Sequence, residues 1–312
     1  MVRYFGWRVA QIVPVLFGVS LVVFLLIRLI PGDPVTTMLA SRATPQLVQQ
    51  ARDQLHLNEP IWQQYWDYLR NAVHGNFGVS FFYQEGVWPL TVPRIPVTVE
   101  LLAFASVLSL IITFPAATLA AAKRGGWVDQ VLRLTFTTAL GIPSFWLGLI
   151  LALYLGVRVK LFPIVGSGSG GLDTLYHLTL PALTIALSMA PLQVRALRSS
   201  MIEVMTADYV TTARACGLRR RFVVWSYLWR NSILPLITVV GVNLGWLIGG
   251  TVIVEQVFSI PGLGSLLINS IATRDYAIIQ LVTTVLALLI IGANLLIDLA
   301  YALFDPRVTL QS

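Results

Sequence analysis

Residues Leu101–Ala122 read LLAFASVLSLIITFPAATLAAA and contain no Asp, Glu, Lys or Arg. A helix needs about 20 consecutive apolar residues to cross a bilayer, because each backbone amide left unpaired in hydrocarbon costs several kcal/mol. The apolarity is continuous, whereas a membrane β-strand alternates apolar and polar residues. This stretch therefore predicts a transmembrane helix.

Five further uncharged stretches bring the predicted spans to six: Val9–Ile27, Leu134–Val157, Thr174–Val194, Asn231–Val254 and Tyr276–Ile297. The composition agrees, since 56% of the 312 residues are hydrophobic and 11% are charged, against about 25% charged residues in a typical soluble domain. The sequence predicts an all-α, multi-pass membrane protein.

Lys and Arg residues are distributed unevenly between the predicted loops. Six spans place both termini on one side, where the loops and termini carry 13 of these residues, against 8 on the other side. Positive charge concentrates in cytoplasmic loops, so we expect both termini in the cytoplasm. The net charge of +7 then follows from topology, and we expect no nucleic acid as a partner.

The chain divides into two regions in this interpretation. Residues 1–95 hold the first span and a long external loop, and residues 96–303 hold a core of five spans. The loop has two amphipathic patterns, Pro45–Leu57 and Pro60–Val73, the second rich in Trp and Tyr. Such residues suit the lipid headgroup zone, but a long loop with helices of its own also suits docking of an external partner. Both interpretations stay open.

Two other segments depart from simple spans. The uncharged run Gln256–Thr273 contains Pro261-Gly262-Leu263-Gly264, and a broken backbone needs protein or water partners within a membrane, so we expect a re-entrant or interfacial segment. About residues 199–235, between the fourth and fifth spans, we expect two cytoplasmic helices, Ser199–Cys216 and Arg219–Arg230. Gly217 is the predicted stop between them, because glycine adopts the left-handed conformation without steric cost.

Few polar groups lie within the predicted spans. Gln193, Asn243 and Glu255 are the candidates for a translocation pathway. Glu255, like Glu100, is expected at the outer end of a span, near solvent. Glycines spaced four residues apart permit close helix packing, and the fifth span has three: Gly241, Gly245 and Gly249.

The sequence lacks the motifs of the common catalytic and metal sites. It has no Gly-Lys pair, and therefore no P-loop for ATP. Its three histidines have no metal-ligand spacing, and its single cysteine excludes a cysteine cluster. We predict no catalytic residue, no metal site and no cofactor in this chain.

The segment Asp208-Tyr209-Val210-Thr211-Thr212-Ala213-Arg214-Ala215-Cys216-Gly217-Leu218, followed by Arg230-Asn231-Ser232-Ile233-Leu234-Pro235, resembles the EAA loop of ABC importer permeases. Its form is that of the dipeptide/oligopeptide/nickel family, B-type subunit. Further matches are Pro31-Gly32-Asp33-Pro34, Glu255 with Pro261-Gly262-Leu263-Gly264, Arg274-Asp275-Tyr276, and Asp305-Pro306-Arg307. Two positions differ: Thr211 and Thr212 replace the Glu-Ala of the loop's name, and Cys216 replaces the family's usual lysine.

The resemblance implies a permease subunit of type I ABC importer architecture in the bacterial cytoplasmic (inner) membrane. Its partners would be a second, C-type permease, two cytoplasmic ATPase subunits that bind ATP and Mg, and an external solute-binding protein that delivers a peptide or similar solute. The implied ATPase-coupling residues are Asp208, Tyr209, Thr212, Ala213, Arg214, Gly217, Leu218, Arg230 and Asn231.

Two other functions are considered. A proton-coupled secondary transporter would use Asp298 or Glu255 as a proton relay, and a structural membrane subunit would have no transport path. Neither requires a rigid, arginine-rich pair of cytoplasmic helices, which an importer driven by a separate ATPase does require.

Overall fold

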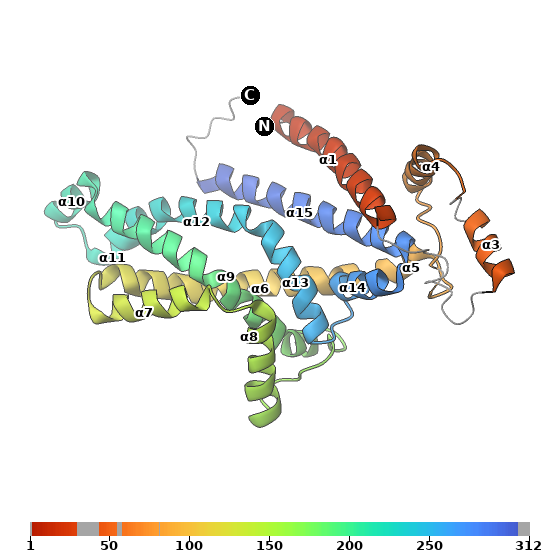
Figure 1. Cartoon of the computed structure of the whole chain (residues 1–312). Coiled ribbons are helices and arrows are strands. Elements are labelled where there is room, and N and C mark those ends of the chain that lie inside the picture. Colours follow the sequence, from red (N-terminus) through yellow and green to blue (C-terminus); the bar gives the residue numbers. More distant parts are fainter. Residues whose placement is uncertain (1, 30–43, 55–57, 81, 305–312) are drawn as a thin grey trace. The chain divides into compact units, whose positions relative to one another are not determined.

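The computed structural model describes residues 2–29, 44–54, 58–80 and 82–304. The Pro31–Pro34 run and Asp305-Pro306-Arg307 of the resemblance lie outside these residues. Regular structure in the described part of the chain is helical, apart from an isolated antiparallel bridge between Val79 and Gly86. The α-helices, labelled in Figure 1, are α1 (Val2–Leu29), α3 (Pro45–Gln54), α4 (Ile61–Val73), α5 (Val87–Thr91), α6 (Arg94–Ala122), α7 (Trp127–Ala139), α8 (Ser144–Leu151), α9 (Leu172–Thr206), α10 (Asp208–Ala215), α11 (Arg220–Val223), α12 (Arg230–Val242), α13 (Leu244–Val257), α14 (Leu263–Thr273) and α15 (Tyr276–Phe304). Two π-helical segments, η2 (Ala152–Arg158) and η3 (Val224–Trp229), follow α8 and α11.

Within the described residues, five helices are long and apolar enough to cross a membrane. The count becomes six if the bent pair formed by α7 and α8–η2 is one span. The predicted all-α class is therefore confirmed. The helices at Pro45–Gln54 and Ile61–Val73 also agree with the amphipathic patterns predicted in the long loop.

The predicted third span, Leu134–Val157, is wrong as a single helix. The chain turns at Gly141-Ile142-Pro143, and the helices on either side are bent by 107°. Proline lacks the N–H that a helix needs and disfavours the helical conformation in the residue before it. α7 therefore ends in two short turns, in which Gly141 N–H bonds to Thr138 O and Ile142 N–H to Ala139 O.

The predicted fifth span, Asn231–Val254, is also interrupted. Asn243 lies between α12 and α13 with φ −90° and ψ 2°. Its side-chain Nδ2 donates to Val239 O at 2.7 Å, and its backbone N–H reaches the same oxygen at 3.2 Å. An asparagine side chain competes in this way for backbone groups and breaks a helix that is otherwise apolar.

The chain forms two compact units. One consists of Met1–Thr98 and Pro261–Ile291, and here the Arg274-Asp275-Tyr276 motif has a local role. Arg274 ends α14 in the left-handed conformation, and the buried Asp275 Oδ1 accepts a hydrogen bond from Ile278 N–H in the first turn of α15. Asp275 also accepts a hydrogen bond from the buried Ser80 hydroxyl. The motif thus starts α15 and attaches Ser80 to it.

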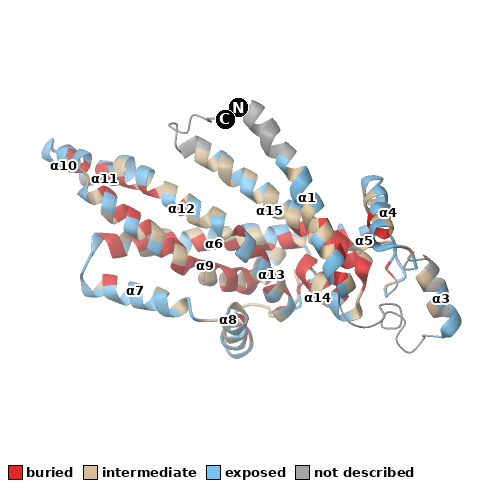
Figure 2. Ribbon diagram, turned by 45° about the horizontal axis from the view of Figure 1, so that its top comes forward, coloured by how far each residue is buried: buried red, intermediate tan, exposed pale blue. Residues whose placement is uncertain are grey.

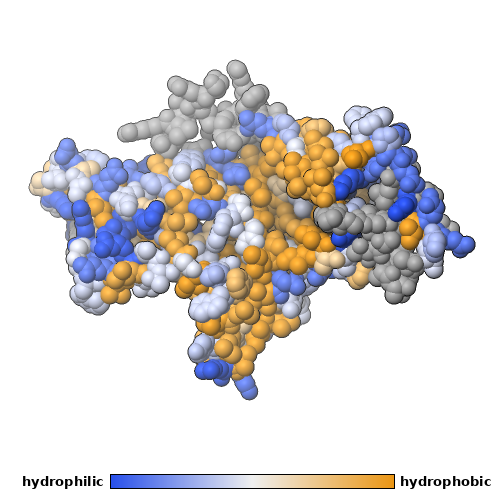
Figure 3. All heavy atoms as spheres, in the orientation of Figure 1, coloured by the Kyte–Doolittle hydropathy of each residue, from blue (hydrophilic) through white to orange (hydrophobic). Residues whose placement is uncertain are grey.

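The other unit, Val99–Ile260 with Gly292–Ser312, has α9 at its centre. Buried residues follow α9 along most of its length (Figure 2), and α7, α8, α10, α12 and α13 pack against it. By contrast, hydrophobic side chains cover the exposed surface of α8 (Figure 3), including Phe145, Trp146 and Leu149. An exposed apolar helix of this kind is typical of a surface in contact with lipid or another membrane subunit.

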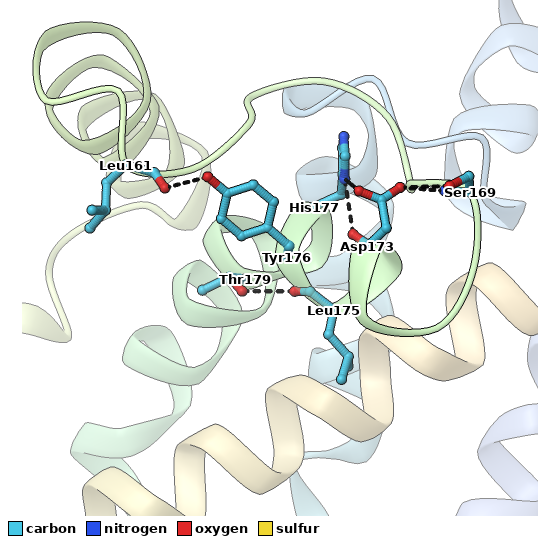
Figure 4. A network of polar contacts seen from close by, with 7 residues as sticks. All are labelled: Leu161, Ser169, Asp173, Leu175, Tyr176, His177 and Thr179. Carbon is cyan, nitrogen blue, oxygen red and sulfur yellow. Dashed lines mark hydrogen bonds and ion pairs between the residues drawn. The ribbon is translucent and has the colours of Figure 1, made fainter.

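A polar network fixes the start of α9 (Figure 4). The Asp173 carboxylate accepts hydrogen bonds from Ser169 N–H at 2.7 Å and from the Ser169 hydroxyl at 3.0 Å, and it lies 3.3 Å from His177 Nδ1. The Tyr176 hydroxyl donates to Leu161 O at 2.8 Å. These contacts tie the loop before α9 to its first turns, where a negative side chain is favourable.

A partly buried ion pair fixes α7 to α9. Arg198 donates two hydrogen bonds to Asp129, Nε to Oδ1 at 2.7 Å and Nη2 to Oδ2 at 2.6 Å, and Gly125 N–H donates to Oδ2 at 2.9 Å. The Asp129 side chain is only 3% exposed. Paired bonds of this kind combine strength with directional specificity.

We expect Asp129→Ala to lower the thermal stability of the purified protein, because it leaves the Arg198 guanidinium and Gly125 N–H without their acceptor, at a cost of about 1–3 kcal/mol. The double variant Asp129→Ala/Arg198→Ala should lose less, since no unpaired charge remains. Asp67→Ala, outside this network, is the control. Unchanged thermal unfolding of Asp129→Ala in detergent would contradict the structural role of this pair.

Candidate functional site

Residues 207–231, called here the 207–231 segment, contain the predicted coupling residues and begin with α10. Ala207, with ψ 144°, separates α10 from α9, so the predicted continuous helix Ser199–Cys216 is wrong. The reason lies in packing, since Val204 and Val210 belong to the same buried core. Six residues apart on one helix they would point in different directions; the break at Ala207 lets both be buried.

α10 ends at the predicted glycine. Gly217 has φ +75°, its N–H donates to Arg214 O at 3.0 Å, and Leu218 N–H donates to Ala213 O at 3.2 Å. These two bonds define a Schellman motif, in which a left-handed residue satisfies the last helical carbonyls. The predicted stop at Gly217 is therefore confirmed, and Cys216 is an exposed free thiol before it.

The predicted second helix of the segment, Arg219–Arg230, has no boundary at its end. α11 passes into the π-helical turn η3 and then into α12. The Asn231 side chain donates to Tyr227 O in this turn at 2.7 Å, which supplies a carbonyl of the widened helix with a side-chain donor. Because α11, η3 and α12 follow one another without a break, a displacement of α11 also moves α12.

The 207–231 segment has one buried and one exposed face. Val210, Ala213, Val223 and Leu228 are buried in a core with residues of α6 and α9. The exposed face carries large side chains, with Tyr209 45%, Phe222 51% and Trp225 67% exposed. Most of the predicted coupling residues are also exposed: Asp208, Tyr209, Thr212, Arg214, Gly217, Leu218, Arg230 and Asn231. The segment is thus packed on one face and exposes large side chains on the other.

The same unit contains a cavity of about 450 Å³, called here the α9 cavity. It lies where both broken helices meet α9. Its lining residues are Ala139–Ser144 from the α7–α8 turn, Ser188, Met189, Leu192 and Gln193 from α9, and Val239, Asn243 and Trp246 from the α12–α13 break. None of these residues is ionisable.

Gln193 is the most constrained polar group of the cavity. It is 1% exposed, and its Oε1 accepts a hydrogen bond from the buried Thr113 hydroxyl at 2.9 Å. This bond fixes the amide and leaves the Nε2 hydrogens as donors at the cavity wall. Asn243 contributes its amide oxygen, since its Nδ2 donates to Val239 O.

Two matches to known families were found. Residues 1–102 match the family described as "Binding-prot-dependent transport system membrane comp, N-term", and residues 113–310 match "Binding-protein-dependent transport system inner membrane component". The chain belongs to this permease family.

Two relatives resemble the permease over its whole length. The glutathione transport system permease protein GsiC of Escherichia coli (strain K12) is 34% identical, covering 99% of each chain. The di/tripeptide transport system permease protein DppB of Pseudomonas aeruginosa (strain UCBPP-PA14) is 36% identical, covering 100% of each chain.

The structure brings Gln193 and Asn243 of the predicted pathway together at the α9 cavity of the permease, but not Glu255. Glu255 is 0% exposed, so its expected position near solvent is wrong. It lies in the last turns of α13, where Ile260 N–H donates to Glu255 O at 2.8 Å and Ser259 takes a positive φ. That turn buries the end of α13.

Of the three glycines spaced four residues apart in the predicted fifth span, only one has another helix packed against it in the described part of the chain. A Cβ on Gly241 would lie 3.3 Å from Ile297 of α15, whereas Gly245 and Gly249 have nothing within 4 Å. Gly241 thus permits close packing within the permease. The other two face open space along an exposed edge of α13.

Sequence reasoning missed Thr113, Trp246 and the Gly141–Pro143 turn as parts of the cavity. Pro143 close to Gly141 within an uncharged run was the signal for the turn. No local signal marks Thr113, because its partner is 80 positions away in the sequence.

We expect Thr113→Val to weaken cargo handling by the permease. Valine keeps the shape of threonine but leaves buried Gln193 Oε1 without its donor, at a cost of about 1–3 kcal/mol. In uptake assays the KM should rise. Thr113→Ser, which keeps the hydroxyl, should stay near the wild type. An unchanged KM in the valine variant would show that Gln193 orientation does not matter for uptake.

Proposed function

We propose that this permease forms, with a second C-type permease, the membrane channel of an ATP-driven importer for peptides or a similar small solute. An external binding protein delivers the solute, and the α9 cavity is part of its path. The 207–231 segment of each permease binds a cytoplasmic ATPase subunit, which holds the ATP and Mg. This chain transports and does not itself hydrolyse ATP.

One observation carries this proposal: α9 reaches from the cavity to the 207–231 segment without interruption. Gln193 lines the cavity, and Val204, in the same helix, lies in the core beneath the segment. Eleven residues of helix separate them by about 16 Å, at about 1.5 Å per residue. A rigid helix that joins a solute cavity to an exposed partner surface is the arrangement that alternating access requires.

The chemistry of the cavity suits a short peptide. A cavity of about 450 Å³ falls within the usual range for small-ligand sites, about 300–1,000 Å³. The amides of Gln193 and Asn243 can exchange hydrogen bonds with peptide groups, and Met189 and Trp246 offer apolar contact. The names of the two relatives, for glutathione and for di- and tripeptides, support the same class of cargo.

The topology belongs to the proposal as well. We infer six spans, with α7 and α8–η2 counted as one, and both termini in the cytoplasm, which the distribution of Lys and Arg supports. The 207–231 segment then faces the ATPase subunits. The bacterial relatives support a location in the inner membrane. Proton-coupled transport gains no support from the cavity, because its lining has no ionisable group.

The decisive experiment purifies the tagged chain from native membranes in mild detergent and reconstitutes the co-purified complex in liposomes. A second permease and nucleotide-hydrolysing subunits should co-purify. Uptake of a labelled peptide should need internal ATP and the binding protein, and should persist when a protonophore collapses the proton gradient. Uptake that follows the proton gradient without ATP would overturn the proposal.

Gly217 tests the coupling role separately. Gly217→Pro removes the N–H that bonds Arg214 O and fixes φ near −65°, against the observed +75°. We expect this variant to insert into the membrane but to lose ATP-driven uptake. Gly217→Asn should keep most of the activity, because asparagine tolerates the left-handed conformation. Wild-type uptake by the proline variant, measured in the same proteoliposomes, would remove the 207–231 segment from the mechanism.

A further inference from the structure

Helix α4 is attached to α1 through one of its faces. The Tyr65 hydroxyl lies 3.0 Å from Ser20 Oγ and donates to Phe17 O at 3.2 Å. Gln64 Oε1 accepts two hydrogen bonds from the Arg28 guanidinium, at 2.7 and 3.1 Å. α4 thus lies beside the end of α1 in a fixed position.

The contacts of two tyrosines give the depth of α4 relative to the spans. Ser20, the partner of Tyr65, lies nine residues before the end of α1 at Leu29, or about 13 Å at 1.5 Å per residue. The ring of Tyr68 lies 6.3 Å from the ring of Phe24, which is five residues, or about 8 Å, before the same end of α1. Both tyrosine side chains therefore extend from α4 into the depth of the spans, while Gln64 meets Arg28 at the end of α1.

A second face of α4 is apolar and exposed. Trp62 is 73%, Trp66 67% and Val73 84% exposed. At 100° per residue these three side chains point in one direction, about a quarter turn from Tyr65. Asn71 is exposed on the opposite side of the helix, and Arg70 is exposed between Asn71 and the apolar side chains. Three sectors follow around α4: one against α1, one apolar and one polar.

α1 also carries exposed apolar side chains near the end to which α4 is attached. Leu26 is 57% and Leu29 75% exposed, and α1 is one of the helices apolar and long enough to cross a membrane. A helix attached to the end of a membrane-spanning helix lies close to the membrane–water boundary, so the solvent available to the apolar sector of α4 at that level is the lipid interface. Trp is the residue that membrane–water interfaces favour, and an amphipathic helix with Trp on one side and charges on the other lies in the interface plane.

We propose that α4 is an interfacial helix that binds the lipid surface through Trp62, Trp66 and Val73. The helix lies at the headgroup level, with Arg70 and Asn71 toward water and the two tyrosines pointing down between lipid and α1. The occupant of the apolar sector is bilayer lipid. The proposed topology is needed only to assign this contact to the outer leaflet. The contact with lipid itself does not depend on the transport function.

The test measures lipid contact at single positions of the full chain. In a Cys216→Ser background, Trp66→Cys and Asn71→Cys are each labelled with an environment-sensitive fluorophore in nanodiscs of phosphatidylethanolamine and phosphatidylglycerol. A lipid with a nitroxide high on its acyl chain should quench the label at 66 several-fold more than the label at 71. Aqueous iodide should give the reverse order. Trp62→Cys provides a second apolar position if the first variant does not insert.

Two outcomes would overturn the proposal. Equal quenching of the labels at 66 and 71 by the nitroxide lipid would place the Trp sector in water. Iodide access at 66 that is lost only when a second permease or the binding protein is added would show that the sector docks a protein. Nitroxide quenching at 66 that is the same with and without these partners supports lipid as the occupant.

Discussion

The need to satisfy every backbone hydrogen bond within the membrane organises this permease. An apolar helix satisfies its own amides, and a break is tolerated only where protein or a water-lined space supplies partners. The two breaks within predicted spans, at Gly141–Pro143 and at Asn243, both open on the α9 cavity. The irregular backbone and the cavity are therefore two aspects of one feature, because residues of both breaks form part of the cavity lining.

The same constraint explains why α9 is the mechanical centre of its unit. It is the longest helix described, from Leu172 to Thr206, and it is buried along most of its length. The Asp129–Arg198 pair attaches α7 to it, and the core that includes Val204 attaches the 207–231 segment. A force on the exposed face of that segment is thus carried by packed side chains and a continuous helix, and does not depend on a flexible linker.

The sequence predicts what depends on local chemistry. Gly217 is recognisable as a helix stop because only a residue at ease with positive φ fits there, and α4 is recognisable by its repeat of Trp and Tyr. Hydropathy misses the bend at Gly141–Pro143, since a break in an uncharged run leaves its average apolarity unchanged. Ala207 has no signal at all: alanine is the best helix former, and the break there comes from burying Val204 and Val210 in one core. The Thr113–Gln193 bond is likewise a product of the tertiary fold.

The absence of charge in the lining of the α9 cavity has a consequence for how such a channel selects its cargo. A short peptide carries charges at its ends, and a site that paired both in a low-dielectric cavity would hold it tightly. A conducting site must bind well enough to admit a solute and weakly enough to release it. Neutral amides at Gln193 and Asn243, beside Met189 and Trp246, meet that requirement. In the proposed function they would contact groups that all short peptides share, and discrimination between peptides would then fall to the external binding protein.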